Sequence, residues 1–415
     1  MKDKYSSILI IGINFFPENI GIGKYTGELA FYLAKLGKKV KVITGFPYYP
    51  YWKIFKGYGN WFYKTQEIDG VSVSRCPIYV PDYLSGSKRM LQDLSFFVTS
   101  FWYLTAKMIT GKRYDLIFVV SPSFLSGFLG LYYRFFYRNA KIVYHIQDLQ
   151  IDAAEELNMI RRKKLLQRIK WSEGKILSKV DWVSTISLGM LKKIEKKPYS
   201  MKKLLIFPNW ADFEKVYKKQ PDFEKLAFLN LPFPKRMVFY SGAIGEKQGL
   251  DMILDAAEKA ALEIKDVFFV ISGSGPYKDI LKQAADLRGI NNVYFIDLQP
   301  IDIFNELLNA AWLHLVLQKD KVSDLLLPSK FSNILAVGGL AMVTCSPGTT
   351  LYEIIEKNKL AIAVQPDNTL VFWEMLQKLS QSTTLITETK LAAENYAKHN
   401  LDKKWIINSF LDKLN

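Results

Sequence analysis

The sequence predicts an α/β protein built from two doubly wound domains, and three observations predict this fold class. Short apolar runs alternate with amphipathic helical segments along the chain, which is the pattern of a parallel sheet covered by helices. The strand-like runs form two series, separated by a polar stretch with several prolines at residues 207–235. The chain has 415 residues, which is too long for one compact core and suits two.

The first series begins with the apolar run ILIIGI at residues 8–13, which predicts a buried strand. A loop with Gly21 and Gly23 follows, and then a helical pattern from Lys24 to Leu36. The further strands expected in this series are residues 38–44, 115–121, 141–146 and 181–187. We expect these elements to form an N-terminal domain over residues 1–203.

The second series predicts a C-terminal domain over residues 204–395. Its expected strands are residues 236–242, 267–273, 292–296, 312–317, 340–344 and 360–364. The last segment, residues 396–415, is amphipathic, and we expect it to pack back on the first domain. Ligands of such sheets bind beyond the carboxyl ends of the strands, so we expect a cleft between the two domains.

The charge balance favours an anionic partner. Lys and Arg number 56 against 40 Asp and Glu, which gives a formal net charge of +16. Nucleic acid, an anionic membrane surface and a phosphorylated substrate all fit this excess. The sequence contains no recognised nucleic-acid motif, so we expect no nucleic-acid partner.

Cysteine and histidine are too sparse for a metal site or a disulfide framework. Cys76 and Cys345 are far apart, and the three histidines are His145, His314 and His399. We therefore expect no metal and a reducing, cytoplasmic compartment. The apolar start at residues 8–13 is too short for a signal peptide, and no clean membrane-spanning run occurs.

The stretch LPSKFSNILAVGG, residues 327–339, places a cation at an expected helix start. Ser329 can cap this helix. Lys330 opposes the helix dipole, which makes sense if both the lysine and the helix hold an anion.

A second loop-to-helix junction, CSPGTTLYEII, spans residues 345–355. Gly348 permits close approach to a ligand, and Thr350 with Glu353 has the spacing of a capping box. Two such helix starts could hold a diphosphate, or they could simply be the caps of two ordinary helices.

Two other strand ends attract attention. SGAIGEKQGLD, residues 241–251, is a glycine-rich strand-to-helix turn that contains Lys247. His145 ends a strand, where its ring would face the expected cleft, although a single histidine is at least as often structural. SGSGP, residues 272–276, lacks the third glycine of a dinucleotide fingerprint, and we interpret it as a tight turn.

Two segments mix aromatic and basic residues, namely residues 48–64 and 88–113. In the second, Leu94, Phe97, Phe101 and Met108 share one helical face, which we expect the sheet to bury. The remaining aromatic residues fit an interfacial membrane contact, and a large buried helix is the alternative.

Several motifs occur here in the order found in a known enzyme family. They are GINFFPENIGIGKYTGELAFYLAKLGKKVKVITGFPYYPYWK, HIQDLQIDAA, FPNWAD, YSGAIGEKQGLD and LPSKFSNILAVGG. The chain resembles the family 4 retaining glycosyltransferases, most of all the branch of colanic acid biosynthesis that is assigned to fucosyl transfer. This resemblance implies a GT-B fold, with two Rossmann-like domains facing across a cleft, and a reaction without metal or cofactor.

The resemblance also implies the site residues. His145 would lie near the donor sugar, and Lys330 would contact the leaving diphosphate; these two are the expected catalytic residues. The expected donor-binding residues are Gly21, Gly23, Gly242, Lys247, Ser329, Asn333, Gly348, Thr349 and Thr350.

The chain departs from the family pattern at three points. Many members carry a Glu-x7-Glu pair, which here reads Leu325 and Asn333. The usual arginine of the glycine turn is Ala243, and Lys247 stands one residue earlier than the common Lys-Gly pair.

The function that the resemblance implies is retaining, metal-independent hexosyl transfer from a nucleotide-diphosphate sugar, with GDP-fucose favoured. The expected acceptor is a polyprenyl-diphosphate-linked saccharide or a polysaccharide in exopolysaccharide biosynthesis. The expected location is the cytoplasm, peripheral on the anionic inner membrane. A GT-B nucleotide-sugar 2-epimerase and a non-enzymatic basic protein that binds membranes or nucleic acid are the alternatives.

Overall fold

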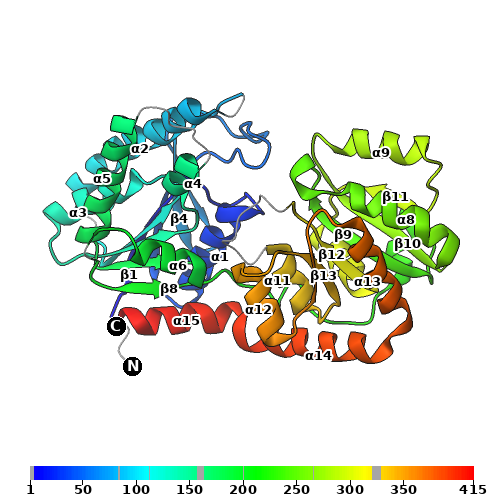
Figure 1. The fold of residues 1–415 in the computed structure, drawn as a ribbon. Helices are drawn as coiled ribbons and strands as arrows, with labels where there is room; N and C mark the ends of the chain where they lie inside the picture. Colours follow the sequence, from blue (N-terminus) through cyan, green and yellow to red (C-terminus); the bar gives the residue numbers. More distant parts are fainter. Residues whose placement is uncertain are drawn as a thin grey trace. The chain divides into compact units, whose positions relative to one another are not determined.

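The computed structural model describes residues 4–82, 85–111, 113–156, 163–199, 201–264, 266–319 and 329–415. The chain forms two compact units (Figure 1). Unit 1 comprises Met1–Pro208 and Lys413–Asn415, and unit 2 comprises Asn209–Asp412. The two chain ends meet within unit 1, where Lys4 Nζ donates to the Asn415 carbonyl oxygen at 3.1 Å and Tyr5 Oη to that of Leu414 at 3.2 Å.

Unit 1 contains an eight-stranded sheet in the order β3-β4-β2-β1-β5-β6-β7-β8. Every neighbouring pair is parallel except the antiparallel β3–β4 pair at one edge. The strands are β1 Ser7–Ile11, β2 Lys39–Gly45, β3 Lys64–Ile68, β4 Val71–Cys76, β5 Leu116–Ser121, β6 Lys141–Ile146, β7 Trp182–Thr185 and β8 Leu204–Ile206. The five expected strands are all present, whereas β3, β4 and β8 were not predicted, because their short or polar runs carry little apolar signal.

The helices of unit 1 connect these strands. They are α1 Gly21–Lys35, α2 Gly86–Ile109, α3 Ser126–Phe136, α4 Gln150–Glu156, α5 Lys163–Lys179 and α6 Leu188–Glu195. The prediction that Leu94, Phe97, Phe101 and Met108 form the buried face of α2 is wrong. The helix instead buries Phe96, Ser100, Tyr103 and Leu104, while Leu94 stays 47% exposed.

Unit 2 contains a six-stranded, wholly parallel sheet in the order β11-β10-β9-β12-β13-β14. Its strands are β9 Arg236–Ala243, β10 Val267–Ser274, β11 Val293–Ile296, β12 Leu313–Val316, β13 Ala341–Thr344 and β14 Ile362–Val364. These are the six strands expected for the second series. Because they are parallel, all their carboxyl ends reach one edge of the sheet.

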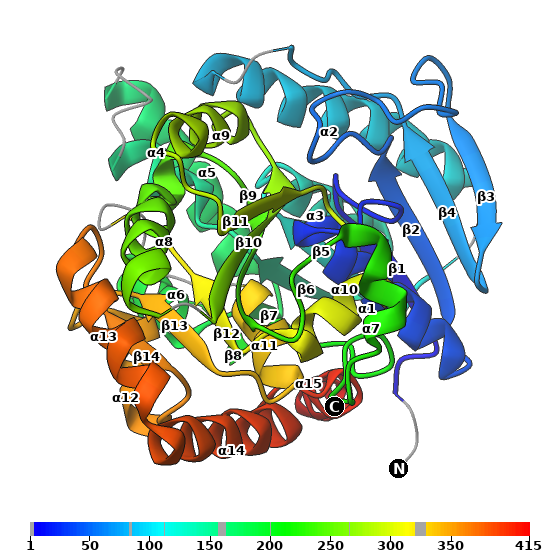
Figure 2. The same ribbon diagram turned by 90° about the vertical axis from the view of Figure 1, so that its right-hand side faces the viewer.

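Alternate side chains of this sheet enter two separate cores. Phe239 of β9 packs with Leu307 and Phe331 on one face, whereas Val238 and Tyr240 enter the core on the other face. Figure 2 shows α10 and α11 on one side of the sheet and α8 and α13 on the other. The helical segments are α7 Phe223–Leu226, η1 Ala227–Leu229, η2 Glu246–Gln248, α8 Asp251–Glu263, α9 Lys278–Leu287, α10 Ile301–Ala310, α11 Ser329–Ala336, α12 Thr350–Asn358, α13 Thr369–Gln381, α14 Thr383–Asn400 and α15 Lys403–Leu414. Helices on both faces of a parallel sheet confirm the doubly wound α/β prediction.

Candidate functional site

Three loops of unit 2 meet at the carboxyl edge of the sheet, because they follow the adjacent strands β9, β12 and β13. The Lys319 amide, after β12, donates to the Lys247 carbonyl oxygen, after β9, at 3.0 Å. Gln318 N donates to Thr344 Oγ1 at 2.7 Å, and this hydroxyl donates back to the Gln318 carbonyl oxygen at 2.8 Å. These bonds fix the three strand ends relative to one another within unit 2.

Lys330, in the first turn of α11, lies over the end of β9. Its Nζ donates to Tyr240 Oη at 2.9 Å and lies 4.4 Å from the centre of the tyrosine ring. The Tyr240 hydroxyl donates to the Ala243 carbonyl oxygen at 2.6 Å, which leaves its lone pairs directed at the ammonium. Tyr240 therefore positions Lys330, and sequence reasoning missed it, because an aromatic residue inside a buried strand is normally a core residue.

Gly242 provides the space for this lysine. A Cβ atom at Gly242 would lie 2.1 Å from Lys330 Cε and 2.3 Å from Nζ, and the backbone φ of +145° is one that side chains rarely adopt. Any other residue at this position would therefore displace the ammonium. The structure thus brings together Lys330, an expected catalytic residue, and Gly242, an expected donor-binding residue.

Burial partly removes the ammonium of Lys330 from water. Burial lowers the pKa of Lys330 to about 8, and no carboxylate among the described residues forms an ion pair with it. An anion placed beside Nζ would reverse this effect, because an opposite charge at close range stabilises the protonated form. The site therefore has the electrostatics of an anion-binding site.

The two helix starts lie at the same sheet edge, since α11 follows β12 and α12 follows β13. Ser329 is the first residue of α11, and its side chain is outside the described part of the chain. The prediction of a capping box formed by Thr350 and Glu353 is wrong, because the N-cap of α12 is Thr349. Its Oγ1 accepts from Tyr352 N at 3.2 Å and donates to the Ser346 carbonyl oxygen at 2.7 Å. Thr350 is instead the first helical residue.

The remaining predicted residues of unit 2 are accessible. Gly348 has a φ of +84° with open space around its missing side chain. Asn333 is half-buried, one helical turn after Lys330, and Lys247 is exposed in η2. Leu325, the other position of the family acid pair, lies outside the described residues.

In unit 1, Gly21 and Gly23 begin α1, and an internal carboxylate accounts for the second glycine. A Cβ atom at Gly23 would lie 2.6 Å from Glu18 Oε2. Glu18 in turn accepts from the amides of Tyr48 and Tyr49 at 2.9 and 3.0 Å, and from Asn14 Nδ2 at 2.9 Å. Burial raises the pKa of Glu18. Glu18 thus joins the glycine loop to the aromatic segment, a role that sequence reasoning missed.

His145 lies inside unit 1 and is only 2% exposed. Its Nδ1 is 3.0 Å from Ser184 Oγ, and its ring packs between Phe118 and Phe207, with centroid distances of 5.6 and 5.2 Å. Burial lowers the pKa of His145 to about 3, so the ring is neutral near pH 7. Contrary to the expectation from its strand-end position, the imidazole does not reach the surface of unit 1.

A charged cluster around Arg89 in unit 1 was also missed. Asp93 of α2 is 9% exposed, and burial raises its pKa to about 7 despite the nearby Arg89 guanidinium. Burial likewise raises the pKa of Asp148, which follows β6, and Arg89 again opposes the shift. Their spacing in the sequence gives no sign that these residues meet.

Within the described residues, no group of three or more His, Cys, Asp or Glu side chains is arranged to hold a metal ion. In the same part of the chain, every helix is too short or too polar to cross a membrane.

Two family models and a curated relative all identify this chain as similar to glycosyltransferases. Residues 21–210 match the Glycosyl transferase 4-like domain, and residues 222–398 match Glycosyl transferases group 1. The chain is 37% identical over 413 residues to an Escherichia coli K12 protein named colanic acid biosynthesis glycosyl transferase WcaI. The aligned region covers 98% of this chain and 99% of that protein.

Solved structures agree on the fold. Sucrose-phosphate synthase from Thermosynechococcus elongatus has a TM-score of 0.72 at 14% identity, covering 98% of this chain and 97% of that one. Anabaena HepE in complex with UDP and glucose has a TM-score of 0.66 at 14% identity, covering 98% of both chains. The two doubly wound units and these similarities confirm the predicted GT-B fold class. The chain therefore belongs to the family 4, group 1 glycosyltransferases.

Proposed function

We propose that this protein transfers a hexose, with retention of configuration, from a nucleotide-diphosphate sugar to a growing cell-surface glycan. The observation that carries the proposal is Lys330, an ammonium without a carboxylate partner among the described residues, held over Gly242 at the strand edge of unit 2. The exopolysaccharide context rests on the similarity to WcaI, whose name assigns it to colanic acid biosynthesis.

The proposed chemistry is electrostatic. As the bond between the anomeric carbon and the phosphate breaks, negative charge grows on the departing diphosphate. Lys330 and the first N–H groups of α11 and α12 would stabilise that charge, with Lys247 as a second, more exposed cation. The acceptor hydroxyl would attack on the same face of the sugar and pass its proton to the leaving phosphate. This route requires neither a metal nor a cofactor.

The proposed donor is a GDP-sugar, with GDP-fucose favoured, and Asn333 would hydrogen-bond the ribose in place of the family carboxylate. The HepE structure contains UDP and glucose, so a UDP-sugar is the main competing donor. The proposed acceptor is a polyprenyl-diphosphate-linked saccharide or a polysaccharide, bound on the side of unit 1. Such an acceptor implies an enzyme that works in the cytoplasm, peripherally on the inner membrane.

A ligand screen by thermal shift tests the donor site. GDP, UDP and their sugars are added to the full chain, and a nucleotide at about 100 times its Kd should stabilise the fold by about 2.7 kcal/mol. Lys330→Ala should lose this shift, whereas Lys282→Ala, which removes an exposed lysine on α9 of the same unit, should keep it. If no nucleotide stabilises the wild-type protein, the proposal is wrong.

A transfer assay then tests the reaction. With the stabilising donor and a lipid-linked saccharide, we expect sugar to appear on the lipid with unchanged anomeric configuration. Release of an epimerised free sugar without any acceptor would instead identify an epimerase.

A further inference from the structure

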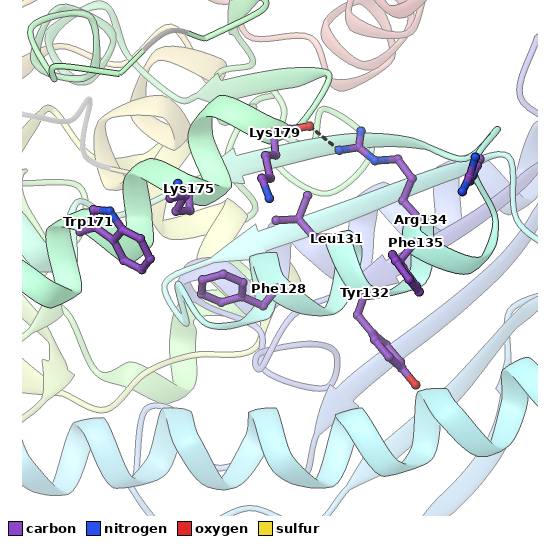
Figure 3. A pocket seen from close by; sticks show the side chains of 9 residues that line it. Phe128, Leu131, Tyr132, Arg134, Phe135, Trp171, Lys175 and Lys179 are labelled. Atoms are coloured by element: carbon purple, nitrogen blue, oxygen red, sulfur yellow. Dashed lines mark hydrogen bonds between the residues drawn. The ribbon is translucent and has the colours of Figure 1, made fainter.

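Unit 1 carries an open pocket of about 780 Å³ between α3 and α5, apart from the donor site of unit 2 (Figure 3). Its lining is basic and apolar. The nine residues are Phe128, Leu131, Tyr132, Arg134, Phe135, Arg138, Trp171, Lys175 and Lys179. Four of them are basic, none is acidic, and four are aromatic. Such a lining complements a ligand that is anionic at one end and apolar at the other.

The two lysines of the lining lie on α5, and most of its apolar residues lie on α3. On α5, Arg168, Trp171, Lys175 and Lys179 recur at helical spacing and are exposed, while Ile169, Ile176 and Leu177 are buried in unit 1. On α3, Phe128, Leu131, Tyr132 and Phe135 form the facing apolar stripe. Figure 3 shows Trp171 and Lys175 on one helix and Phe128, Tyr132 and Phe135 on the other.

In the described part of the chain, three of the four basic residues of this lining have no ion-pair partner. Among the described residues, Arg134 pairs with Asp181 at 2.8 Å, while no ion pair involves Arg138, Lys175 or Lys179. The Lys175 ammonium lies 5.0 Å from the centre of the Trp171 ring. Glu173, the acid of α5, is buried and bonded to Lys197 at 2.7 Å.

Large apolar side chains on this surface face solvent. Phe135 is 75% exposed, Phe136 57% and Trp171 61%. The apolar surface continues onto α2, whose Phe101 contacts Tyr132 at a centroid distance of 4.7 Å and whose neighbouring Trp102 is 63% exposed. A contiguous patch of this kind marks an interaction surface.

We propose that this α3–α5 surface docks unit 1 on the anionic headgroups of a lipid bilayer. The cations of α5 bind the lipid phosphates, while Phe135, Phe136 and Trp171 enter the interface between headgroups and acyl chains. The inference rests on the proposed peripheral membrane location and names the surface and lipid chemistry responsible. A single-stranded nucleic acid would also use aromatic and basic residues, and the experiment below includes it as an outcome that overturns the proposal.

Vesicle flotation of the full chain tests the docking. The protein should float with phosphatidylcholine vesicles that contain phosphatidylglycerol, and should stay behind with phosphatidylcholine alone or in high salt. Lys175→Gln/Lys179→Gln should lower the partition coefficient roughly 30-fold, given the usual contribution of each basic residue near anionic lipid. Phe135→Ser should lower it about tenfold, because one large apolar contact is lost.

The matched control is Lys282→Gln/Lys378→Gln, which removes the same charge from exposed positions on α9 and α13 of unit 2. This control should float like the wild type. Equal flotation of the two double variants, or no wild-type flotation with anionic vesicles, would overturn the proposal. So would tighter binding to a single-stranded oligonucleotide that the Lys175→Gln/Lys179→Gln variant loses.

The nucleotide thermal shift separates this inference from the proposed function. It should be the same in all the surface variants, because none of them alters the donor site. A normal nucleotide shift combined with failed flotation overturns only the docking surface, whereas normal flotation without any nucleotide shift overturns only the donor site.

Discussion

Lys330 of unit 2 and His145 of unit 1 are both shielded from water, but only Lys330 is a cation, and no carboxylate of the described residues pairs with it. Burial lowers the pKa of Lys330 to about 8, so the side chain remains mostly protonated at neutral pH. Burial lowers the pKa of His145 to about 3, so that ring is neutral among Ser184, Phe118 and Phe207. A buried neutral group with partners is complete within its unit, whereas a buried cation without an anion is suited to a charged ligand.

Lys330→Ala should have the largest effect on the rate of sugar transfer, because it removes the buried cation. Removing one preorganised donor to a developing charge typically lowers kcat by about 10²–10³. The exposed ammonium of Lys247 should matter less, and we expect Lys247→Ala to lower kcat about tenfold or less. Initial rates of sugar transfer measure both, and near-normal turnover of the Lys330 variant would contradict the proposed leaving-group role.

The second prediction concerns the stability of unit 1, where Gly23 leaves room for the Glu18 carboxylate. Gly23→Ala places a methyl group against the Glu18 carboxylate and should destabilise unit 1 by roughly 1–3 kcal/mol. Gly59→Ala is the matched control, because nothing lies within 4 Å of the added methyl group and its φ is unstrained. Thermal unfolding of both variants should show a lower Tm for Gly23→Ala alone. Equal Tm values for the two variants would mean that Glu18 does not restrict the side chain at position 23.

The third effect is a pH dependence of donor binding. The free protein loses the Lys330 proton as pH rises through about 8, and an anionic ligand raises this pKa in the complex. Above about pH 8, the Kd for a nucleoside diphosphate should therefore increase up to about tenfold per pH unit. Calorimetric titration across this range measures the effect. The Lys330→Ala variant should lack this dependence, and an unchanged wild-type Kd would argue against the lysine contact.

The smallest effect concerns Asn333. A neutral hydrogen bond to a ribose hydroxyl contributes about 1 kcal/mol, so Asn333→Ala should weaken donor binding roughly fivefold. Asn333→Gln keeps the amide and serves as the conservative comparison. The same nucleotide titration reports both, and unchanged affinity in Asn333→Ala would remove this residue from the donor site.

Most of the fold was predictable because most strands of the two sheets contain apolar runs. Residues 8–13 and 236–242 are examples, since buried parallel strands need no alternation of polar residues. The β3–β4 pair was missed because its β3 partner, Lys64–Ile68, is polar and sits at an exposed edge. The buried face of α2 was assigned wrongly, because aromatic residues surround the helix and periodicity cannot choose among several apolar faces.

The candidate site likewise contains residues that the sequence predicted and residues that only the structure revealed. Lys330 was predicted because a cation at a helix start is unusual in itself. Tyr240, which positions it, lies 90 residues away in the sequence, and Glu18 reaches Tyr48 across 30 residues. Contacts over such separations leave no local pattern in the chain.

The sequence by itself determined the two doubly wound units, the glycine-rich loops and the unusual lysine, because these follow from local periodicity, turn chemistry and charge. Only the tertiary structure decided which side chains lose contact with water and which partners meet them there. It placed Lys330 against Gly242 and Tyr240, without an ion-pair partner in the described part of the chain, and it enclosed His145 among its own neighbours. The physical reason is that desolvation depends on every segment packed around a group, while the sequence records only its neighbours along the chain.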